Sequence, residues 1–555
     1  MRKKIAANGF VLQAVAGTYV VTLGWDIQDA NKKDGLLGFA IQRTDHTENE
    51  TYFMRGSKTF PDASPKLPLG GTASSHEQPF QSFQWADYSA KPDHSYSYTL
   101  IPMYGRPGAL QDGAALTVDI KTEPELGATH SVFFNRGAVA SQEYARRFQN
   151  KPPDQVGQAA YDWLSRGLLE SILAFIGKAA GRGFGLRIAI YEFQWPAILQ
   201  AVHDAAGRGA DVKVLFDAIE NATDDPVTKN QEAIETAKIA DLCQGITEGK
   251  IMHNKFIVLL QANKPVEVLT GSTNNTESAL FGQLNCAHIV ADAAAAGMYL
   301  DWWNELARDL PLAQLRTWND QKAPAPPNPP DQGTSEVFSP QKGTSTLARY
   351  AEISGGATRA LFMTFAFGMN KDFVPTYMQE DDVLRFALMD KEGSGKGLAK
   401  QKAIIDEIRK RKNAVVAIGQ NITLNEFDRW LKERSGLPSS VHVKWVHTKF
   451  MLVDPLSDDP VVITGSANFS DASVETNHEN MLVIRGDTRV ADIYLGEFMR
   501  QFTSYAFRDA AYNATQGDKA EDWKPQDLIS DPSWIKRYDG PGTSGALRRR
   551  YFSGQ

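Results

Sequence analysis

Two stretches of the chain, His253-Asn-Lys-Phe-Ile-Val258 and His447-Thr-Lys-Phe-Met-Leu-Val-Asp454, repeat one pattern and decide how the rest is interpreted. Each is followed, 18 residues after its histidine, by a second motif: Gly271-Ser-Thr-Asn274 in the first copy and Gly465-Ser-Ala-Asn468 in the second. Identical spacing in two copies is hard to obtain by chance. The sequence therefore predicts an internal duplication.

The flanking segments repeat as well. Apolar runs at 186–193 and 360–367 have the composition of strands buried on both faces, and aromatic helical patterns follow at 298–306 and 493–501. Segments 131–134 and 336–339 open the two copies, and the proline-rich stretch 323–333 between them favours an extended linker. We expect two duplicated α/β domains at 126–322 and 335–555, joined by a linker at 323–334.

The first 125 residues have a different pattern. Alternating apolar residues from Tyr19 to Trp25, and similar runs at 38–43 and 96–103, predict strands separated by Asn, Gly, Asp and Pro. No amphipathic helix is expected before about residue 140. Residues 1–125 are thus expected to form an all-β sandwich, and the Trp-bearing early strand and the Tyr-x-Tyr late strand resemble a fibronectin type III module.

The composition limits the choice of function. A formal net charge of −7 provides no overall basic field for a nucleic-acid backbone, which counts against a nuclease without excluding a local basic groove. Cys243 and Cys286 are too few for a disulfide framework, and we expect both to be buried. No transmembrane run and no cleavable signal is expected, so the default location is cytoplasmic, or exported without a cleavable signal.

The repeated motifs bring together groups that suit phosphate chemistry. On a strand, His-x-Lys places both side chains on one face, so a fixed positive charge lies beside an imidazole. Gly-Ser-x-Asn at the end of the next strand supplies hydroxyl, amide and backbone donors for phosphate oxygens. No His, Asp or Glu cluster has the spacing of a metal site, so no metal and no other cofactor is expected.

These residues resemble the signature of the phospholipase D superfamily, and the resemblance covers about residues 130 to 510. The second copy is complete, with Asp454 after its His-x-Lys and Glu479 in the place of the downstream glutamate that orients a catalytic histidine. The first copy departs from the pattern, because Leu260 stands at the aspartate position and the segment 283–288 contains no glutamate. The two halves are therefore expected to be inequivalent.

The resemblance implies a metal-independent phosphodiesterase in which one histidine forms a phosphohistidine and the other protonates the leaving oxygen. The implied catalytic residues are His253, Lys255, His447, Lys449, Asp454 and Glu479. The implied phosphate-binding residues are Ser272, Asn274, Ser466 and Asn468. Which histidine attacks stays open, although Glu479 is expected to support His447. One chain carries both motifs, so a monomer is sufficient for one site.

Three functions remain open. Hydrolysis or transfer of a phospholipid head group is favoured by the acidic balance, with peripheral membrane contact. A nuclease cleaving DNA or RNA is the alternative, for which the segment 477–480 resembles that of small bacterial nucleases of the superfamily and 409–412 is the one dense basic run. The third is a non-catalytic phosphate-binding protein, suggested by the departures in the first copy. Transfer of the cardiolipin synthase type is less favoured, because such relatives usually carry membrane-spanning segments.

Overall fold

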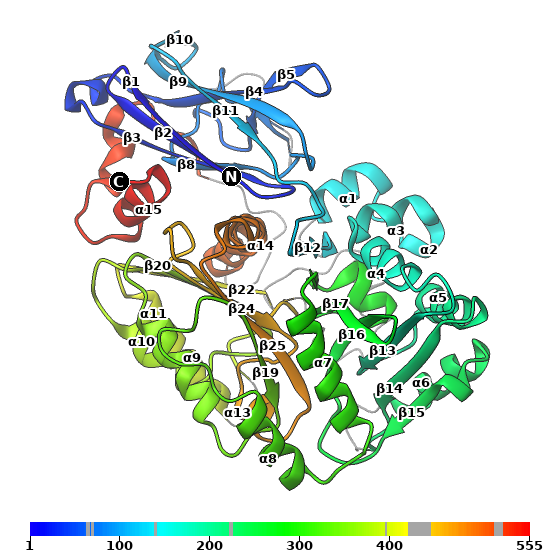
Figure 1. The fold of residues 1–555 in the computed structure, drawn as a ribbon. Helices are drawn as coiled ribbons and strands as arrows, with labels where there is room; N and C mark the ends of the chain where they lie inside the picture. Colours follow the sequence, from blue (N-terminus) through cyan, green and yellow to red (C-terminus); the bar gives the residue numbers. More distant parts are fainter. Residues whose placement is uncertain are drawn as a thin grey trace.

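The computed structural model describes residues 1–62, 67, 71–137, 141–220, 226–393, 397–419, 446–515 and 526–555. Figure 1 shows an all-β region formed by the N-terminal part of the chain and, below it, two α/β halves that lie side by side. The chain is thus mixed α/β, with an antiparallel β region at its N-terminus, as the sequence predicts.

The N-terminal region consists of two main antiparallel sheets. One has the strand order β1-β2-β3-β8, and the other has the order β10-β9-β4-β5 with β11 also paired to β9. The strands of these sheets are β1 (Arg2–Ala7), β2 (Phe10–Ala16), β3 (Val21–Ile27), β4 (Gly38–Asp45), β5 (Glu50–Phe53), β8 (Gln84–Asp87), β9 (Ser95–Arg106), β10 (Ala109–Asp112) and β11 (Leu116–Lys121). Trp25, Tyr96 and Tyr98 are buried in the shared core. The alternating pattern from Tyr19 to Trp25 therefore marks a strand with a buried face.

Each α/β half contains a seven-stranded mixed sheet, and the two sheets have the same strand order. The first is β12-β18-β17-β16-β13-β14-β15, and the second is β19-β25-β24-β23-β20-β21-β22. The first sheet comprises β12 (His130–Phe134), β13 (Phe184–Ile190), β14 (Asp211–Asp217), β15 (Cys243–Ile246), β16 (Lys255–Gln261), β17 (Lys264–Gly271) and β18 (Cys286–Val290). The second comprises β19 (Gly333–Ser339), β20 (Ala360–Phe365), β21 (Leu384–Met389), β22 (Ala414–Ile418), β23 (Phe450–Val453), β24 (Val461–Gly465) and β25 (Glu479–Arg485). The corresponding order supports the predicted duplication.

Helices cover both sheets, which is why their central strands carry apolar residues on both faces. The helices of the first half are α1 (Ser141–Phe148), α2 (Pro153–Val156), α3 (Gln158–Ser165), α4 (Leu168–Gly177), α5 (Pro196–Gly207), α6 (Val227–Thr236), α7 (Ala293–Leu306) and α8 (Leu312–Lys322). Those of the second half are α9 (Ser345–Gly355), α10 (Val374–Met378), α11 (Leu398–Arg409), α13 (Asp471–Glu475) and α14 (Thr488–Thr515). The proline-rich stretch lies between α8 and β19, where the linker is predicted.

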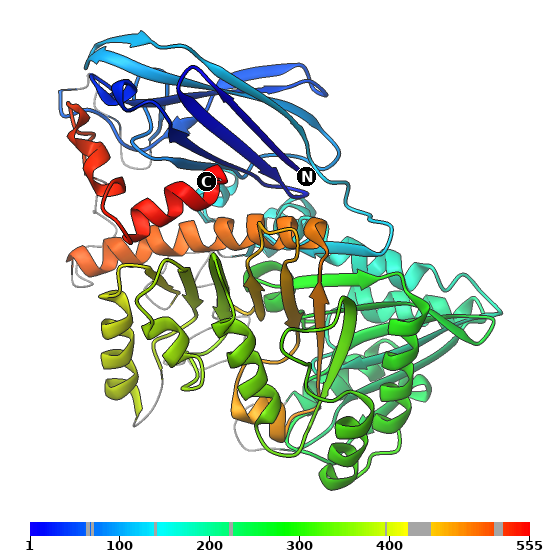
Figure 2. The same ribbon diagram turned by 60° about the vertical axis from the view of Figure 1, so that its left-hand side comes forward.

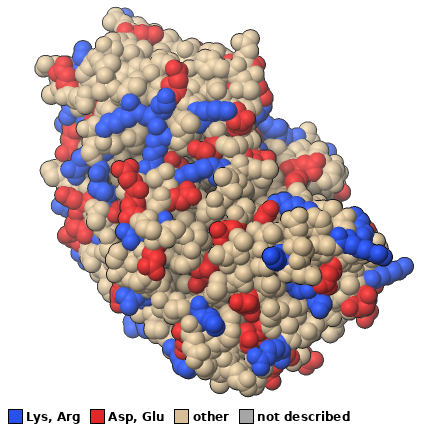
Figure 3. Space-filling model, viewed as in Figure 1, with Lys and Arg blue, Asp and Glu red and all other residues tan. Residues whose placement is uncertain are grey.

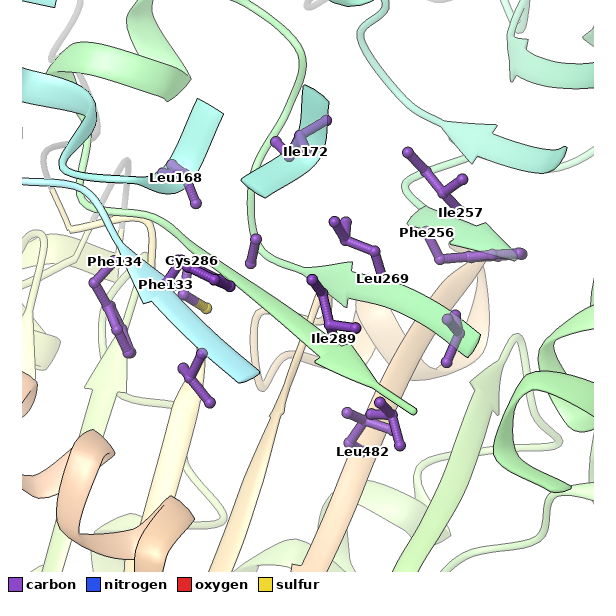
Figure 4. Close-up of a cluster of buried hydrophobic side chains, with 14 of the residues drawn as sticks. Phe133, Phe134, Leu168, Ile172, Phe256, Ile257, Leu269, Cys286, Ile289 and Leu482 are labelled. Atoms are coloured by element: carbon purple, nitrogen blue, oxygen red, sulfur yellow. The ribbon is translucent and has the colours of Figure 1, made fainter. Parts of the chain in front are cut away.

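The two sheets meet through β16 and β17 of the first and β24 and β25 of the second, and they share one apolar core. Figure 4 shows Phe133 and Phe134 of β12 and Ile289 of β18 on one side of this junction, with Leu482 of β25 beside them. All four side chains are at least nine-tenths buried. The halves are therefore packed against each other, which fixes the position of any site between them.

Helix α14 separates the N-terminal region from the α/β halves (Figure 2). The C-terminal segment then returns to the N-terminal region, where η7 (Pro532–Tyr538) and α15 (Ser544–Ser553) pack beside β3 and β8. Trp534 is 1% exposed and belongs to the same core as Trp25. The last 30 or so residues of the predicted range 335–555 thus contribute to the packing of the N-terminal region.

The two cysteines differ in their exposure. Cys286 is buried as predicted, but Cys243 is only partly buried because it begins the edge strand β15, and both thiols are free. Within the described residues, none of the helices combines the length and apolar character needed to cross a bilayer.

Candidate active site

The two His-x-Lys motifs lie at corresponding places in the two halves. His253 precedes β16 by two residues and His447 precedes β23 by three, so each histidine lies in a loop just outside its sheet rather than on a strand as predicted. Both histidine residues are buried, at 5% and 4% exposed. Backbone bonds join the halves here, because the His447 N–H donates to the Leu284 carbonyl at 3.2 Å and the His478 N–H donates to the Ile251 carbonyl at 3.0 Å.

Glu479 supports the histidine of the opposite half. His253 Nδ1 lies 2.8 Å from Glu479 Oε2 and 3.0 Å from Oε1, although 226 residues separate the two in sequence. The expectation that Glu479 supports His447 is therefore wrong. The reason is that the loop before β25 crosses to the first half, so a carboxylate of the second motif faces the first histidine.

His447 has a neutral partner. Its Nδ1 lies 2.8 Å from Oδ1 of Asn285, a buried residue of the first half. Asn285 follows Ser272 by 13 residues, as Glu479 follows Ser466 by 13. Asn285 thus occupies the position of the missing glutamate, and the equal spacing was the sequence signal that could have found it. Each histidine has an oxygen acceptor from the other half, but one is an anion and the other is an amide.

The two motif serines contact these acceptors. Ser466 Oγ donates to Glu479 Oε2 at 2.6 Å, and Ser272 Oγ donates to Asn285 Oδ1 at 2.8 Å. Both serines are fully buried. Their observed contacts differ from the predicted binding of phosphate, because the strand end that carries each serine faces the acceptor of the opposite histidine. They position Glu479 and Asn285.

The motif lysines and asparagines surround the histidines. Lys255 Nζ donates to the carbonyl of His253 at 2.8 Å and lies 5.3 Å from the centre of the Tyr191 ring, and Lys449 Nζ donates to the carbonyl of His447. Asn274 Nδ2 donates to Glu192 Oε2, whereas Asn274 Oδ1 and Asn468 Oδ1 make no hydrogen bond within the described structure. Lysine and amide groups of both halves therefore lie around the two histidines.

Several neighbouring residues were missed by the sequence analysis. Tyr191 packs edge-on against His253, with ring centres 5.0 Å apart, and Glu192 accepts from Asn274. Asn480 Oδ1 accepts from the Lys255 N–H at 3.1 Å, and Asn480 Nδ2 donates to Thr270 at 2.6 Å. The Tyr191 and Glu192 contacts lie within the first half, whereas those of Asn480 join the two halves. All of them connect segments far apart in sequence, so no spacing indicates them.

Asp454 lies at the other end of β23 from His447 and has a different environment. Its carboxylate accepts from the backbone N–H groups of Thr358, Arg359 and Ala360 at 2.8, 2.7 and 2.8 Å, and from the Thr358 hydroxyl at 2.7 Å. A carboxylate used in this way fixes the loop that enters β20. The prediction of Asp454 as a catalytic residue is therefore not supported by its contacts. Leu260, its counterpart in the first half, is buried in the apolar core.

Burial sets the protonation of the His253–Glu479 pair. Burial lowers the pKa of His253 to about 4, even though Glu479 acts in the opposite direction, and Lys255 and Lys449 lower it further. Burial alone would raise the pKa of Glu479, but His253, Lys255 and Ser466 hold it below its usual value. At neutral pH the pair therefore consists of a neutral imidazole and a carboxylate.

The described residues contain no group of three or more His, Cys, Asp or Glu side chains placed to bind a metal ion. Lys255 and Lys449 place two cationic groups beside His253 and His447. Chemically, the arrangement offers one imidazole paired with an anion, a second imidazole paired with an amide, and two ammonium groups. Such a set can bind a phosphate group and exchange protons with it.

Two parts of the chain match one protein-family model. Residues 172–307 and 398–502 match the family model described as "Cardiolipin synthase, PLD-like domain". The first segment contains the first His-x-Lys and Gly-Ser-x-Asn motifs, and the second segment contains the second pair. The chain therefore contains a phospholipase D-like domain. No curated protein matches the sequence.

Three solved structures are similar to parts of the chain. Phosphatidylserine synthase of Haemophilus influenzae is 13% identical, with 60% of this chain and 84% of that chain covered and a TM-score of 0.42. Yeast tyrosyl-DNA phosphodiesterase is 13% identical, with 57% and 87% covered and a TM-score of 0.32. Nuc of Salmonella typhimurium, a phospholipase D family member, is 26% identical, with 25% and 87% covered and a TM-score of 0.21.

Proposed function

We propose that this protein is a phosphodiesterase that acts through one site shared by its two halves. The observation that carries the proposal is the crossed pairing of His253 with Glu479 and of His447 with Asn285. Each histidine depends on a residue of the other half, so neither half alone contains a complete site. Members of the matched family act on phosphodiesters, which supports the same reaction class.

In this proposal His253 is the nucleophile. Its imidazole is neutral at neutral pH, and Glu479 holds Nδ1, so Nε2 is the nitrogen that attacks phosphorus. The attack forms a P–N bond and breaks the P–O bond of the leaving alcohol. The phosphohistidine ring carries a positive charge, which the adjacent Glu479 carboxylate stabilises.

His447 supplies and removes the protons. It enters the cycle as an imidazolium, donates its Nδ1 proton in a hydrogen bond to Asn285, and gives its Nε2 proton to the leaving oxygen. Neutral His447 then takes a proton from water, whose oxygen attacks phosphorus and breaks the P–N bond. An amide partner suits a group that must gain and lose charge, because a carboxylate would hold the imidazolium form more strongly.

Lys255, Lys449, Asn274 and Asn468 bind the non-bridging phosphate oxygens in this scheme. Their two positive charges offset the charge that develops on phosphorus, a task that many phosphoryl-transfer enzymes assign to Mg²⁺. We propose that no metal ion is required. The reaction should then proceed in the presence of a chelator.

We propose phospholipid head groups as the substrate class. The basic run 409–412, the one dense candidate for nucleic-acid binding in the sequence, is largely neutralised: Arg409 pairs with Asp509 at 2.8 Å, Lys410 with Glu407 at 2.6 Å and Arg411 with Glu380 at 2.5 Å. Figure 3 also shows acidic and basic side chains interspersed over the α/β part of that face. A chain with a net charge of −7 and paired surface cations has little field to attract a polyanion.

We also propose that the halves arose by duplication and that the N-terminal region is a fibronectin type III-like sandwich. The equal strand orders and equal motif spacings support the first proposal, and the two antiparallel sheets support the second. One chain carries a complete site, so activity does not require dimerisation. We propose that the protein contacts lipid at the membrane surface, as a peripheral protein.

The experiment compares wild type with His253→Ala and His447→Ala, all in EDTA, on phospholipids, single-stranded and double-stranded DNA, and RNA. His203→Ala, which removes an exposed histidine on α5, is the matched control. We expect head-group release from phospholipid that both active-site substitutions abolish and the control retains. Cleavage of nucleic acid alone would replace the substrate class with the nuclease alternative, and no activity on any substrate would favour a non-catalytic phosphate-binding protein.

A further inference from the structure

Three arginines from distant parts of the chain meet where the end of α3 and helix α14 contact the N-terminal β region. Arg136 follows β12, Arg166 ends α3, and Arg500 belongs to α14. Arg166 and Arg500 share one carboxylate, Glu497, which Arg500 Nε contacts at 2.8 Å. We call these three side chains the arginine cluster. It lies outside the proposed active site.

Arg136 has no carboxylate partner among the described residues. Its guanidinium donates to the carbonyl of Trp163 and lies 4.8 Å from the centre of the Trp163 ring. The nearby Glu125 accepts instead from the hydroxyl of Tyr19, over whose ring Arg166 stacks at 4.6 Å. Burial, followed by the like charges of Arg166 and Arg500, lowers the pKa of Arg136 to about 9. A half-buried cation is therefore held beside two others without an anion of its own.

A further donor in the cluster is unsatisfied. Arg166 is 6% exposed, and its Nε makes no hydrogen bond in the described structure. Leaving a buried charged donor without a partner is costly, and so is placing like charges together at low dielectric. An oxyanion would relieve both costs, because guanidinium groups bind phosphate-type oxygens through paired N–H donors.

We propose that the arginine cluster binds a phosphate-type oxyanion, either free or as part of a lipid head group. A phosphate monoester carries about two negative charges at neutral pH, which suits a place where guanidinium groups outnumber carboxylates. The cluster is reachable from solvent, since Arg136 is only half-buried. The exposed Arg147, which pairs with Glu143, lies 5.7 Å from the centre of the Trp163 ring.

Hydrogen bonds connect the arginine cluster to Asn285, the residue that contacts His447. Arg500 donates to the carbonyl of Asn135 at 2.7 Å, and Asn135 Oδ1 accepts from the Asn285 N–H at 3.0 Å. The proposal concerns binding alone and does not depend on catalysis. It can therefore be tested on protein in which the proposed active site has been disabled.

The test uses the full chain with Lys255→Ala and Lys449→Ala, so that phosphate does not bind at the histidines. Arg136→Gln is compared with Arg146→Ala, which removes an exposed, paired arginine of α1. Inorganic phosphate is titrated against thermal unfolding, with KCl at equal ionic strength as the control for screening. We expect phosphate to raise Tm in the parent and in Arg146→Ala, and the half-saturating concentration to increase about tenfold or more in Arg136→Gln.

Arg136→Gln keeps a donor for the Trp163 carbonyl and removes one of three repelling charges, so it should unfold at the parent's temperature or above it without phosphate. A second arm measures co-sedimentation with phosphatidylcholine vesicles that contain phosphatidic acid, against vesicles of phosphatidylcholine alone. An increase of Tm with phosphate that depends on Arg136 identifies free phosphate as a ligand. Co-sedimentation with phosphatidic acid vesicles that depends on Arg136 identifies a lipid head group as a ligand. Equal responses of parent and Arg136→Gln in both arms, or no response of the parent in either, would overturn the proposal.

Discussion

His253 Nδ1 lies 2.8 Å from Glu479 Oε2, so the carboxylate that supports the first motif histidine comes from the second half of the chain. The interaction is fully buried and is reinforced by Ser466, whose hydroxyl donates to the same oxygen at 2.6 Å. Removing the charge while keeping the shape therefore tests its role directly.

Glu479→Gln is expected to lower kcat about 100-fold with little change in KM, because the amide no longer stabilises the positive charge of the phosphohistidine. Steady-state kinetics on the substrate found in the panel measure this, and circular dichroism checks that the fold is retained. A variant that keeps the wild-type kcat would show that Glu479 has only a structural role.

Asn285→Asp places a charge where the protein has an amide. A carboxylate next to His447 favours the imidazolium form, so the alkaline limb of the kcat/KM profile should move up by about one pH unit. Asn285→Ala, which removes the hydrogen bond, should lower kcat about 10- to 100-fold without moving that limb. A profile that is identical in wild type and Asn285→Asp would remove His447 from the proton transfer.

Asp454→Ala separates a structural aspartate from a catalytic one. The carboxylate accepts three backbone N–H groups and one hydroxyl, so its loss should reduce the free energy of unfolding by about 2 to 4 kcal/mol. The kcat of the folded fraction should stay within about twofold of wild type. Urea unfolding and kinetics below the transition provide the two values, and a 100-fold loss of kcat at unchanged stability would restore the catalytic interpretation.

His478 links burial to acid sensitivity. The ring is 1% exposed, neither ring nitrogen has a hydrogen-bond partner in the described structure, and burial lowers the pKa to about 4. In the unfolded chain a histidine titrates near 6.5, so between about pH 6.5 and 4 the unfolded state binds a proton that the folded state does not. Stability is then lost as the pH falls through this range.

His478→Leu installs the residue type of its buried counterpart Leu284 and removes this one proton. At pH 5 the variant should gain about 2 kcal/mol over wild type relative to their difference at pH 7.5, from 1.4 kcal/mol per pH unit and proton. Urea unfolding at the two pH values measures it. His253, whose pKa is also lowered, remains in both proteins, so some acid sensitivity should persist; an unchanged difference would mean that His478 does not titrate in this range.

The sequence allowed the repeated elements to be predicted because the pattern of each is local. The apolar runs at 186–193 and 360–367 correspond to β13 and β20, and the aromatic patterns at 298–306 and 493–501 lie in α7 and α14. The motif residues were found because two copies share one spacing. The all-β start of the chain followed from alternation alone.

The partners of the histidines could not be predicted in the same way. Both acceptors cross from one half to the other, and local spacing assigned Glu479 to the nearer histidine in sequence. Asn285 was overlooked because an amide was not sought where the family has a glutamate. The return of Trp534 to the core of the N-terminal region likewise depends on packing between segments about 500 residues apart.

Covalent phosphorylation of His253 can be detected by trapping the intermediate. His447→Ala and wild type are mixed in EDTA with a 4-nitrophenyl phosphodiester, whose leaving group needs no protonation, and intact protein and peptide masses are recorded after a rapid quench. His447→Ala should accumulate one phosphoryl ester on the peptide containing His253, since release requires His447. An adduct on His447 in a His253→Ala control, or release of nitrophenol by His447→Ala with no adduct on any residue, would contradict it.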